Sequence, residues 1–514
     1  MKADLILVNG PIYSGMRSGP FSYLAVRENR ILAIGRGSGR AHVGRNTEII
    51  DLRGKAVVPG IIDSHLHLLD YAWSLQRINL EPCLTSHEVI SQLKERAQNT
   101  VPGEWILGRG WRQDQFHGFP NKKLLDDIFP LHPVALNSRD GHFLWVNSVA
   151  LKVSGLEKAV DVSGSYVGKN ADGGPDGIFG ESAVELMTPH ISKPDAESRK
   201  CSLVAAQQKL HEFGIVGLHS TDGNQAFGDL QDLHRQSKLR LRIFHSIPLS
   251  QLDEAVKISL KSGFGDAWFR FGFVKIFSDG TLGSQSAWML QPFHETNTTG
   301  IETISERELT EKIGVALKNG IAVGVHAIGD RAGRQVLNAF EANSPWTGVP
   351  CARSRIEHAQ ILNPEDIPRF RKIGVLASMQ PHHAISDHEA ALRYWGERSR
   401  YSYAWRSLQD SGAMLIFGSD APVESPDPLQ GMRAAVHRSN WEDRRQTISA
   451  INTLAAYTRN PAVASGEESE RGTLEPGKLA DFVIFSDDPI ATEFQNTCVT
   501  GTAIDGKFVY RNFE

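Results

Sequence analysis

The sequence contains few cysteines, four in 514 residues. They lie about a hundred residues apart and form no Cys-x-x-Cys pair: Cys83, Cys201, Cys351 and Cys498. Paired, closely spaced cysteines are typical of thiolate metal sites and of small disulfide scaffolds. Their absence argues against both and suggests a reducing compartment.

Excess positive charge and long apolar runs are also missing. The 55 Lys and Arg against 59 Asp and Glu give a formal net charge of −4, which argues against a nucleic-acid partner. The first apolar run, Leu5 to Val8, is too short for a secretory signal, and no later stretch approaches 18 uncharged apolar residues. We therefore expect a cytoplasmic protein that acts on a small molecule, with no nucleic acid or membrane as partner.

Histidine, in contrast, is abundant. Nineteen histidines accompany the four cysteines, so a metal site would be built from imidazole and carboxylate. The composition, 40% hydrophobic and 22% charged, is that of an ordinary globular protein.

The pattern of apolar residues differs between the two ends of the chain and its middle. Short apolar runs bounded by Gly, Asn and Asp fill the first 58 residues and recur near the end, which predicts short strands. We expect residues 1–58 and 466–514 to form a composite β-sandwich domain. Residues 59–465 alternate strand and helix patterns, such as the amphipathic stretch Ser86–Asn99, and predict a metal-dependent (β/α)8 TIM barrel as the catalytic domain.

Eight candidate strands support the barrel, and most of them end in a polar residue. They are Val58–Asp63, Val134–Asn137, Ile215–His219, Phe271–Phe277, Ala322–His326, Ser354–His358, Val375–Ser378 and Met414–Ser419. Barrel enzymes keep their chemistry at the carboxyl ends of such strands.

Potential metal ligands follow several of these strands. His65 and His67 form a His-x-His pair, and residues two apart in a strand point to the same face. One basic residue comes at the end of each of three later strands, and a carboxylate follows the last: Lys275, His326, His358 and Asp420. We expect these groups to converge on the mouth of the barrel.

These segments resemble the amidohydrolase superfamily, and more narrowly its YtcJ-like and N-substituted formamide deformylase-like group. The resemblance runs nearly end to end, through Val58–His67, Ser138–His142, Val274–Ser284, His326–Asp330, Arg355–His358, Gly418–Val423 and Gly472–Asp481. It implies hydrolysis by an ion-activated hydroxide with a divalent metal as cofactor, Zn²⁺ in the first place, at one or two ions per subunit.

The resemblance also implies roles for individual residues. His65 and His67 would hold the more buried metal, His326 and His358 the more exposed one, and Asp420 would bind the first metal and shuttle the proton. Lys275 stands where many relatives carry a carboxylated lysine that bridges two metals. A carbamate offers anionic oxygens, whereas an ammonium has no lone pair. A salt-bridged Lys275 and ligation by Glu181 are the alternatives.

Other polar residues near strand ends are expected to contact substrate. The candidates are Trp111, Asp140, His142, His219 and His382, with at most one of His382 and His383 facing the site.

The expected reaction is cleavage of a non-peptide C–N bond, in an amide or an N-substituted formamide. An esterase, a lactonase or a cyclic-amide hydrolase with the same site is the alternative, and a catalytically inactive metal-binding regulator is a further one. The sequence leaves the oligomeric state open, with a homodimer as the assembly to consider.

Overall fold

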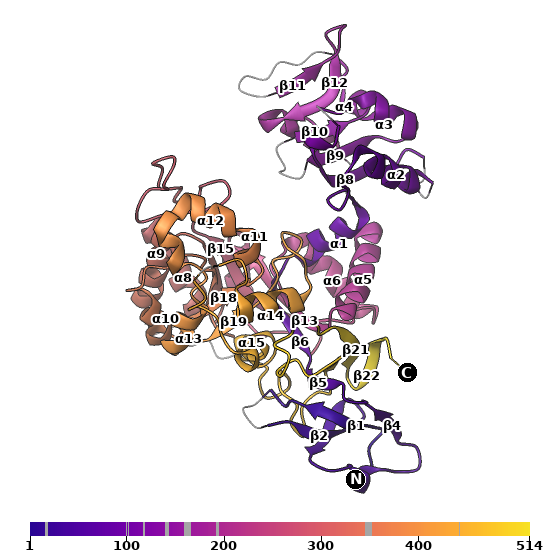
Figure 1. The fold of residues 1–514 in the computed structure, drawn as a ribbon. Coiled ribbons are helices and arrows are strands. Elements are labelled where there is room, and N and C mark those ends of the chain that lie inside the picture. The colour runs from indigo at the N-terminus through magenta and orange to yellow at the C-terminus, as the bar shows by residue number, and fades with distance from the viewer. Residues whose placement is uncertain are drawn as a thin grey trace. The chain divides into compact units, whose positions relative to one another are not determined.

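Figure 1 shows the fold in a computed structural model. The structure describes residues 1–15, 19–98, 100, 102–116, 119–138, 143–158, 166–191, 195–344, 352–441 and 443–513. The side chains of residues 181 and 182 are not described. The chain divides into two compact units. The first comprises Met1–Tyr71 and Leu203–Glu514, and the second comprises Ala72–Ser202.

Both ends of the chain contribute to one eight-stranded sheet in the first unit, as the sequence predicted. Its strand order is β22-β21-β20-β5-β1-β2-β3, with β4 paired to β1. Buried side chains such as Leu24, Val57 and Phe482 hold the two ends together. The strands are β1 (Leu5–Ile12), β2 (Phe21–Arg27), β3 (Arg30–Gly35), β4 (Glu48–Asp51), β5 (Ala56–Pro59), β20 (Phe482–Phe485), β21 (Val499–Ile504) and β22 (Lys507–Arg511).

The rest of the first unit is an eight-stranded parallel (β/α)8 barrel, which confirms the predicted fold class. The strands, in barrel order, are β6 (Ile61–Leu66), β13 (Ile215–Ser220), β14 (Arg242–Pro248), β15 (Phe269–Phe277), β16 (Ala322–Ala327), β17 (Arg355–His358), β18 (Leu376–Met379) and β19 (Leu415–Phe417). The backbone N–H of Asp420, just after β19, donates to the carbonyl of His65 on β6 at 2.8 Å and ties the last strand to the first.

Amphipathic helices cover the barrel strands. In α9 (Asp330–Ala342), Val336, Leu337 and Phe340 are buried and recur at helical spacing. The other principal helices are α5 (Ala196–Glu212), α6 (Asn224–Arg235), α7 (Leu252–Lys257), α8 (Glu306–Lys318), α10 (Ile367–Ile373), α13 (Trp405–Asp410), α14 (Pro428–His437), α15 (Ala450–Tyr457) and α16 (Arg459–Ala464).

Two details of the barrel differ from the sequence prediction. Val134–Asn137 is not a barrel strand, because it lies in β9 of the second unit, and the barrel position is taken by β14 (Arg242–Pro248). The apolar pattern of β14 is interrupted by Arg242, His245 and Ser246, all of which are buried. The predicted strand Val58–Asp63 is divided at Gly60 between the end sheet and the barrel. A Cβ on Gly60 would lie 2.4 Å from Val216 Cγ2, so the close packing there requires glycine.

The second unit has a core and a sheet of its own. The sheet order is β11-β12-β10-β9-β8-β7, and α2 (Ser86–Ala97) buries Val89 and Leu93 in the unit's core, as its sequence pattern predicted. The remaining elements are β7 (Ile78–Asn79), β8 (Ile106–Trp111), α3 (Lys122–Ile128), β9 (Val134–Ser138), β10 (Phe143–Val146), α4 (Ser148–Ser154), β11 (Tyr166–Lys169) and β12 (Pro175–Gly180). This unit falls within the range that the sequence analysis assigned to the barrel domain.

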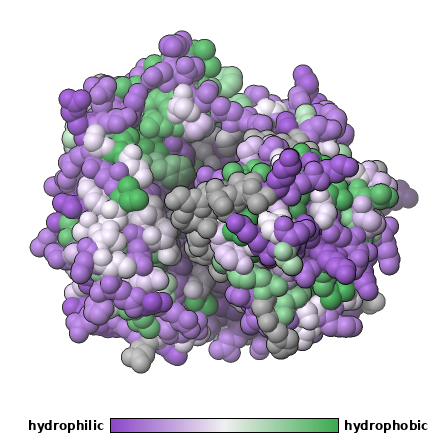
Figure 2. Space-filling view, turned by 90° about the horizontal axis from the view of Figure 1, so that it is seen from above, coloured by the Kyte–Doolittle hydropathy of each residue, from purple (hydrophilic) through white to green (hydrophobic). Residues whose placement is uncertain are grey.

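The apolar character of the helices and of the surface can be compared with that of a membrane protein. Among the described residues, no helix combines the length and the apolar character that crossing a bilayer requires. On the face shown in Figure 2, hydrophilic residues predominate and hydrophobic ones are scattered among them, as is usual for a globular surface.

Candidate metal centre

The six residues predicted as metal ligands come together at the carboxyl ends of the barrel strands. His65, Lys275, His326 and His358 lie on β6, β15, β16 and β17, whereas His67 and Asp420 directly follow β6 and β19. All six line one cavity of about 380 Å³, here called the metal cavity: His65, His67, Lys275, His326, His358 and Asp420.

Two of the histidines have their tautomers fixed by hydrogen bonds away from the cavity. His65 Nδ1 donates to Glu357 Oε2 at 2.7 Å, and His358 Nδ1 donates to the amide oxygen Oε1 of Gln380 at 2.8 Å. Each ring therefore keeps a lone pair on Nε2. His65 Nε2 is buried and makes no hydrogen bond in the described structure.

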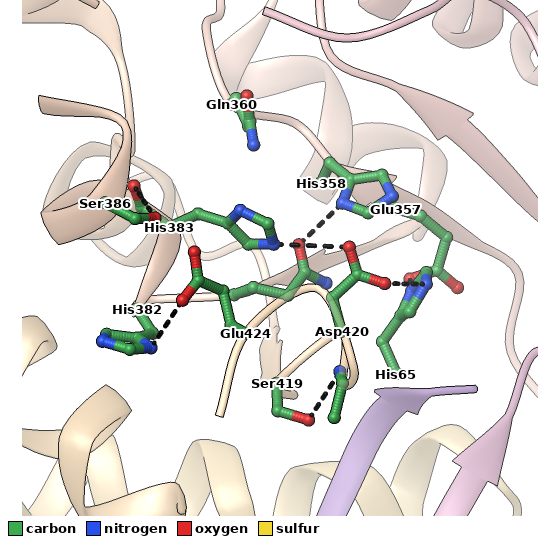
Figure 3. A network of polar contacts seen from close by, with 12 residues as sticks. His65, Glu357, His358, Gln360, His382, His383, Ser386, Ser419, Asp420 and Glu424 are labelled. Atoms are coloured by element: carbon green, nitrogen blue, oxygen red, sulfur yellow. Dashed lines mark hydrogen bonds and ion pairs between the residues drawn. The ribbon is translucent and has the colours of Figure 1, made fainter. Parts of the chain in front are cut away.

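Asp420 lies at the centre of the cluster (Figure 3). Its Oδ1 is 3.4 Å from both His65 Nε2 and His67 Nε2, and its Oδ2 is 3.3 Å from His383 Nε2. Burial alone would raise the pKa of Asp420, but the interaction with His65 and the hydrogen bonds from His383 and His67 hold that pKa well below its usual range. Asp420 is therefore a carboxylate at neutral pH.

The donor atoms fit a divalent cation. The donors of His65, His67 and Asp420 all lie within 4.8 Å of one another, and so do those of His358, His383 and Asp420. Buried imidazole nitrogens around a carboxylate form the donor set that Zn²⁺ and similar ions prefer. The Nε2 of His65, which makes no hydrogen bond to a described residue, is the kind of atom that would coordinate such an ion.

The backbone at the cluster is strained. His358 has φ 72° and Asp420 has φ 62°, a left-handed region that non-glycine residues seldom adopt. Such conformations persist where surrounding structure enforces them, and they concentrate at functional sites. Nearby Gly418 allows β19 to approach β6, since a Cβ there would lie 2.4 Å from the backbone nitrogen of His65.

Lys275 is buried in the metal cavity without a salt bridge in the described structure. Burial lowers the pKa of its ammonium, although Glu357 and Asp420 counteract the effect. Asp279, the salt-bridge partner considered from the sequence, instead accepts hydrogen bonds from the backbone N–H groups of Ile328 at 3.0 Å and Gly329 at 2.8 Å. The Lys275 ammonium lies 5.2 Å from the ring centre of Phe277.

His326 lies beside His358, with 4.5 Å between ring centres. Its Nε2 donates to the carbonyl of Gly280 at 3.1 Å, which leaves Nδ1 with the lone pair. Burial lowers the pKa of His326 to about 4 and that of His358 well below its usual range, so both rings are neutral, as metal ligation requires.

Of the two adjacent histidines, His383 reaches the metal cavity. The sequence analysis chose His382, but that side chain contacts Glu424, with Nδ1 3.1 Å from Oε2, whereas His383 lines the cavity beside Asp420. The short helix α11 (His383–Ser386) begins here, and its turn directs the two side chains apart.

The structure does not place the other predicted substrate contacts in the metal cavity. His219 is fully buried inside the barrel and accepts a hydrogen bond on Nδ1 from Arg355 Nη1 at 2.8 Å. Trp111 belongs to the core of the second unit, 1% exposed, where it packs against Trp145. Asp140 and His142 lie outside the described residues. Glu181 begins a 3-10 helix of the second unit, and its side chain is likewise outside the described part.

Glu357 was not among the predicted site residues, although it lies in the segment Arg355–His358 that carries the family resemblance. Arg355 and Glu357 are two apart on β17, and both are fully buried. Two charged residues at alternate positions of a buried strand indicate a polar barrel interior, and this signal was available in the sequence.

Comparison with known proteins shows the family of this chain. Residues 48–510 match the amidohydrolase family, and the chain belongs to that family. It is 33% identical to the Protein LONG AFTER FAR-RED 3 of Arabidopsis thaliana, over 99% of this chain and 92% of that one. It is 30% identical to the putative amidohydrolase YtcJ of Bacillus subtilis, over 90% of each chain.

An enzyme of assigned activity is among the more distant relatives. The N-substituted formamide deformylase of Arthrobacter pascens is 26% identical over 99% of this chain and 98% of its own. Among solved structures, an uncharacterized metal-dependent hydrolase of Pyrococcus furiosus superposes with a TM-score of 0.80 at 29% identity, covering 95% of this chain and 99% of that chain. The fold and the family therefore define a hydrolase of the metal-dependent amidohydrolase class.

Proposed function

We propose that this protein hydrolyses a non-peptide C–N bond, in an amide or an N-substituted formamide, with a divalent metal bound in the metal cavity. The observation that supports the proposal best is the position of Asp420, whose two carboxylate oxygens lie 3.3 to 3.4 Å from three histidine nitrogens. An ionised carboxylate in this place can both hold a cation and exchange a proton with a reacting group.

His65, His67 and Asp420 would hold one ion, and His326 and His358 a second, with a carboxylated Lys275 between the two. When bound, a divalent ion such as Zn²⁺ lowers the pKa of water to about 7 and polarises a carbonyl oxygen. The buried, neutral histidines and the lowered pKa of Lys275 favour this assignment, because CO₂ adds only to a neutral amine.

Asp420 would act as the proton shuttle. It would take a proton from the attacking water and deliver it to the leaving nitrogen, so that the amine departs neutral. Because its pKa is low, Asp420 is ionised at neutral pH and has an oxygen that can accept that proton. His383, 3.3 Å from Asp420 Oδ2, is the histidine in position to donate to the substrate's carbonyl oxygen.

The substrate type is inferred from the relatives' assigned activity together with the site. The deformylase of Arthrobacter pascens acts on N-substituted formamides, and the present chain matches it over nearly its full length. An ester, a lactone or a cyclic amide presents the same carbonyl carbon to the same groups and is the second candidate class.

A substrate panel with a matched variant tests the proposal. Purified, metal-loaded protein is assayed against N-formyl, N-acyl and lactone compounds, beside the Asp420→Asn variant. We expect turnover of a C–N substrate that Asp420→Asn abolishes, while the variant still binds that substrate. Turnover unchanged by Asp420→Asn would overturn the shuttle, and turnover of lactones alone would overturn the C–N assignment.

A further inference from the structure

Two carboxylates line the metal cavity without an ammonium or guanidinium partner. They are Asp387, between α11 and α12 (His388–Trp395), and Glu424, four residues after Asp420. Among the described residues, their ion pairs are with histidines only, at 3.8 Å from His383 Nδ1 to Asp387 and 3.1 Å from His382 Nδ1 to Glu424. Figure 3 shows Glu424 and His383 on the same side of Asp420.

The polar contacts of the two carboxylates come from histidines and from neutral side chains. The contacts of Asp387 with described residues all fall on Oδ2, which accepts from the hydroxyl of Tyr403 at 2.7 Å and from Gln360 Nε2 at 3.3 Å. Glu424 pairs through Oε2 with His382, and the hydroxyl of Ser386 also donates a hydrogen bond to this carboxylate. Asp387 Oδ1 and Glu424 Oε1 are therefore acceptors without a charged partner in the described structure.

Gln360 adds a neutral acceptor to the same end of the cavity. Its side chain lines the cavity and is 3% exposed, and its Oε1 accepts no hydrogen bond from a described residue. A buried carbonyl oxygen without a donor costs free energy unless a ligand or water supplies one. Its place beside Asp387 is fixed by the hydrogen bond that Gln360 Nε2 donates.

Apart from the predicted metal ligands, the Asp, Glu, Lys and Arg side chains that line the metal cavity are all acidic. Lys275 is the only Lys or Arg among the described residues that line it, and Lys275 belongs to the ligand cluster. Charged groups that are largely withdrawn from water are normally paired. Leu282, Ile328 and Val423 line the same cavity and offer an apolar wall for an alkyl stem.

We propose that the metal cavity selects amides whose far end carries an ammonium or guanidinium group, which Glu424 and Asp387 bind. This specificity rests on the proposed function, because it names the substrate class of the same site. The cation would donate hydrogen bonds to the oxygens of Glu424, Asp387 and Gln360. A substrate that ends in a carboxylate would find only hydrogen-bond acceptors there and would be repelled by the two carboxylates.

Three N-formyl alkylamines of equal chain length test the proposal. They end in an ammonium, a methyl group or a carboxylate, and both kcat/KM and the dissociation constant are measured with the metal-loaded protein. The dissociation constants come from calorimetry with Asp420→Asn, which binds without turnover. We expect the ammonium compound to be preferred over the methyl compound by about tenfold, and the carboxylate compound to be the poorest.

Two variants assign the preference to these residues. Glu424→Gln and Asp387→Asn should each reduce the ammonium preference, measured as the ratio of the dissociation constants of the ammonium and methyl compounds, about tenfold. Glu308→Gln is the matched control, because Glu308 is an exposed carboxylate lining a neighbouring pocket. If Asp387→Asn unfolds through loss of its bond to Tyr403, Glu424→Gln alone decides.

The outcomes separate the specificity from the reaction. Turnover of all three compounds at equal kcat/KM would overturn the specificity and leave the hydrolase proposal standing. Tighter binding of the ammonium compound without turnover of any of the three would support the specificity and count against the reaction. Equal binding in Glu424→Gln and wild type would overturn the role of Glu424.

Discussion

His65 on β6 and Glu357 on β17 form a fully buried hydrogen bond across the barrel, 2.7 Å from Nδ1 to Oε2. Burial raises the pKa of Glu357, but the interactions with His65, Lys275 and Arg355 outweigh burial and lower that pKa to about 2. The carboxylate is therefore charged at neutral pH. It fixes the histidine's tautomer and turns Nε2 toward the metal cavity.

Replacing Glu357 should weaken metal binding. Partners that orient a metal-binding histidine typically contribute about 10- to 100-fold in affinity or activity. We expect Glu357→Gln, which keeps an acceptor but loses the charge, to weaken Zn²⁺ binding about tenfold, and Glu357→Ala to weaken it further. Competition titration with a chromogenic chelator measures both. Glu365→Gln, an exposed control whose side chain is 83% accessible, should bind as wild type does. Unchanged affinity in Glu357→Ala would contradict the role.

Lys275 should carry a carboxyl group in the metal-loaded protein. Native mass spectrometry is expected to show the added mass of one CO₂, and reconstitution of metal-free protein should depend on bicarbonate. Lys275→Ala should lose the added mass and bind less than the full complement of metal. An active enzyme with an unmodified Lys275 would contradict this and favour a single-ion site.

The buried ion pair of Arg242 should be important for stability. Arg242 on β14 binds Asp481, with 2.6 Å from Nε to Oδ2, and Asp505, with 2.7 Å from Nη2 to Oδ1. Removing one partner of a buried pair leaves an uncompensated charge and costs about 3–5 kcal/mol. We expect Arg242→Met to lower the free energy of unfolding by that amount in urea denaturation. Arg235→Met, at an exposed pair with Asp232, should cost no more than about 1 kcal/mol. Equal losses would contradict the expectation.

His245 should make stability depend on pH. It is fully buried between Phe227 and Phe269, and burial lowers its pKa from 6.5 to about 3. Between pH 6.5 and pH 3 the unfolded chain binds a proton at His245 and the folded chain does not. The free energy of unfolding therefore has the full contribution of the buried, neutral His245 above pH 6.5, and it falls by about 1.4 kcal/mol per pH unit as the pH drops toward 3. His245→Phe should show a shallower decline than wild type between pH 7 and 5. Parallel declines would contradict this.

The sequence predicted the barrel because its strands and helices leave periodic patterns, and it predicted that six polar residues converge because they follow strand ends. It failed at β9 and β14 for a physical reason. Val134–Asn137 also lies in a parallel strand pair, with β8, and is locally indistinguishable from a barrel strand. The strand β14 carries two buried polar residues, Arg242 and His245, and the partner of Arg242, Asp481, comes from a distant part of the chain.

In the site, too, some residues could be predicted from their position along the chain, whereas others depend on contacts with distant residues. The convergence of His65, His67 and Asp420 could be predicted from local position, whereas the choice of His383 over His382 depends on the turn at the start of α11. The burial of His219 depends on Arg355, 136 residues away. Such contacts are set by the closed barrel and cannot be read from spacing.

Metal removal and restoration tests the central claim most directly. The metal content of the protein is measured by mass spectrometry beside amide hydrolysis, during dialysis against a chelator and then during titration with Zn²⁺. We predict that activity falls in proportion to bound metal and returns as the ion is restored, in wild type but not in Asp420→Asn. Full activity in protein that retains no metal would contradict the account.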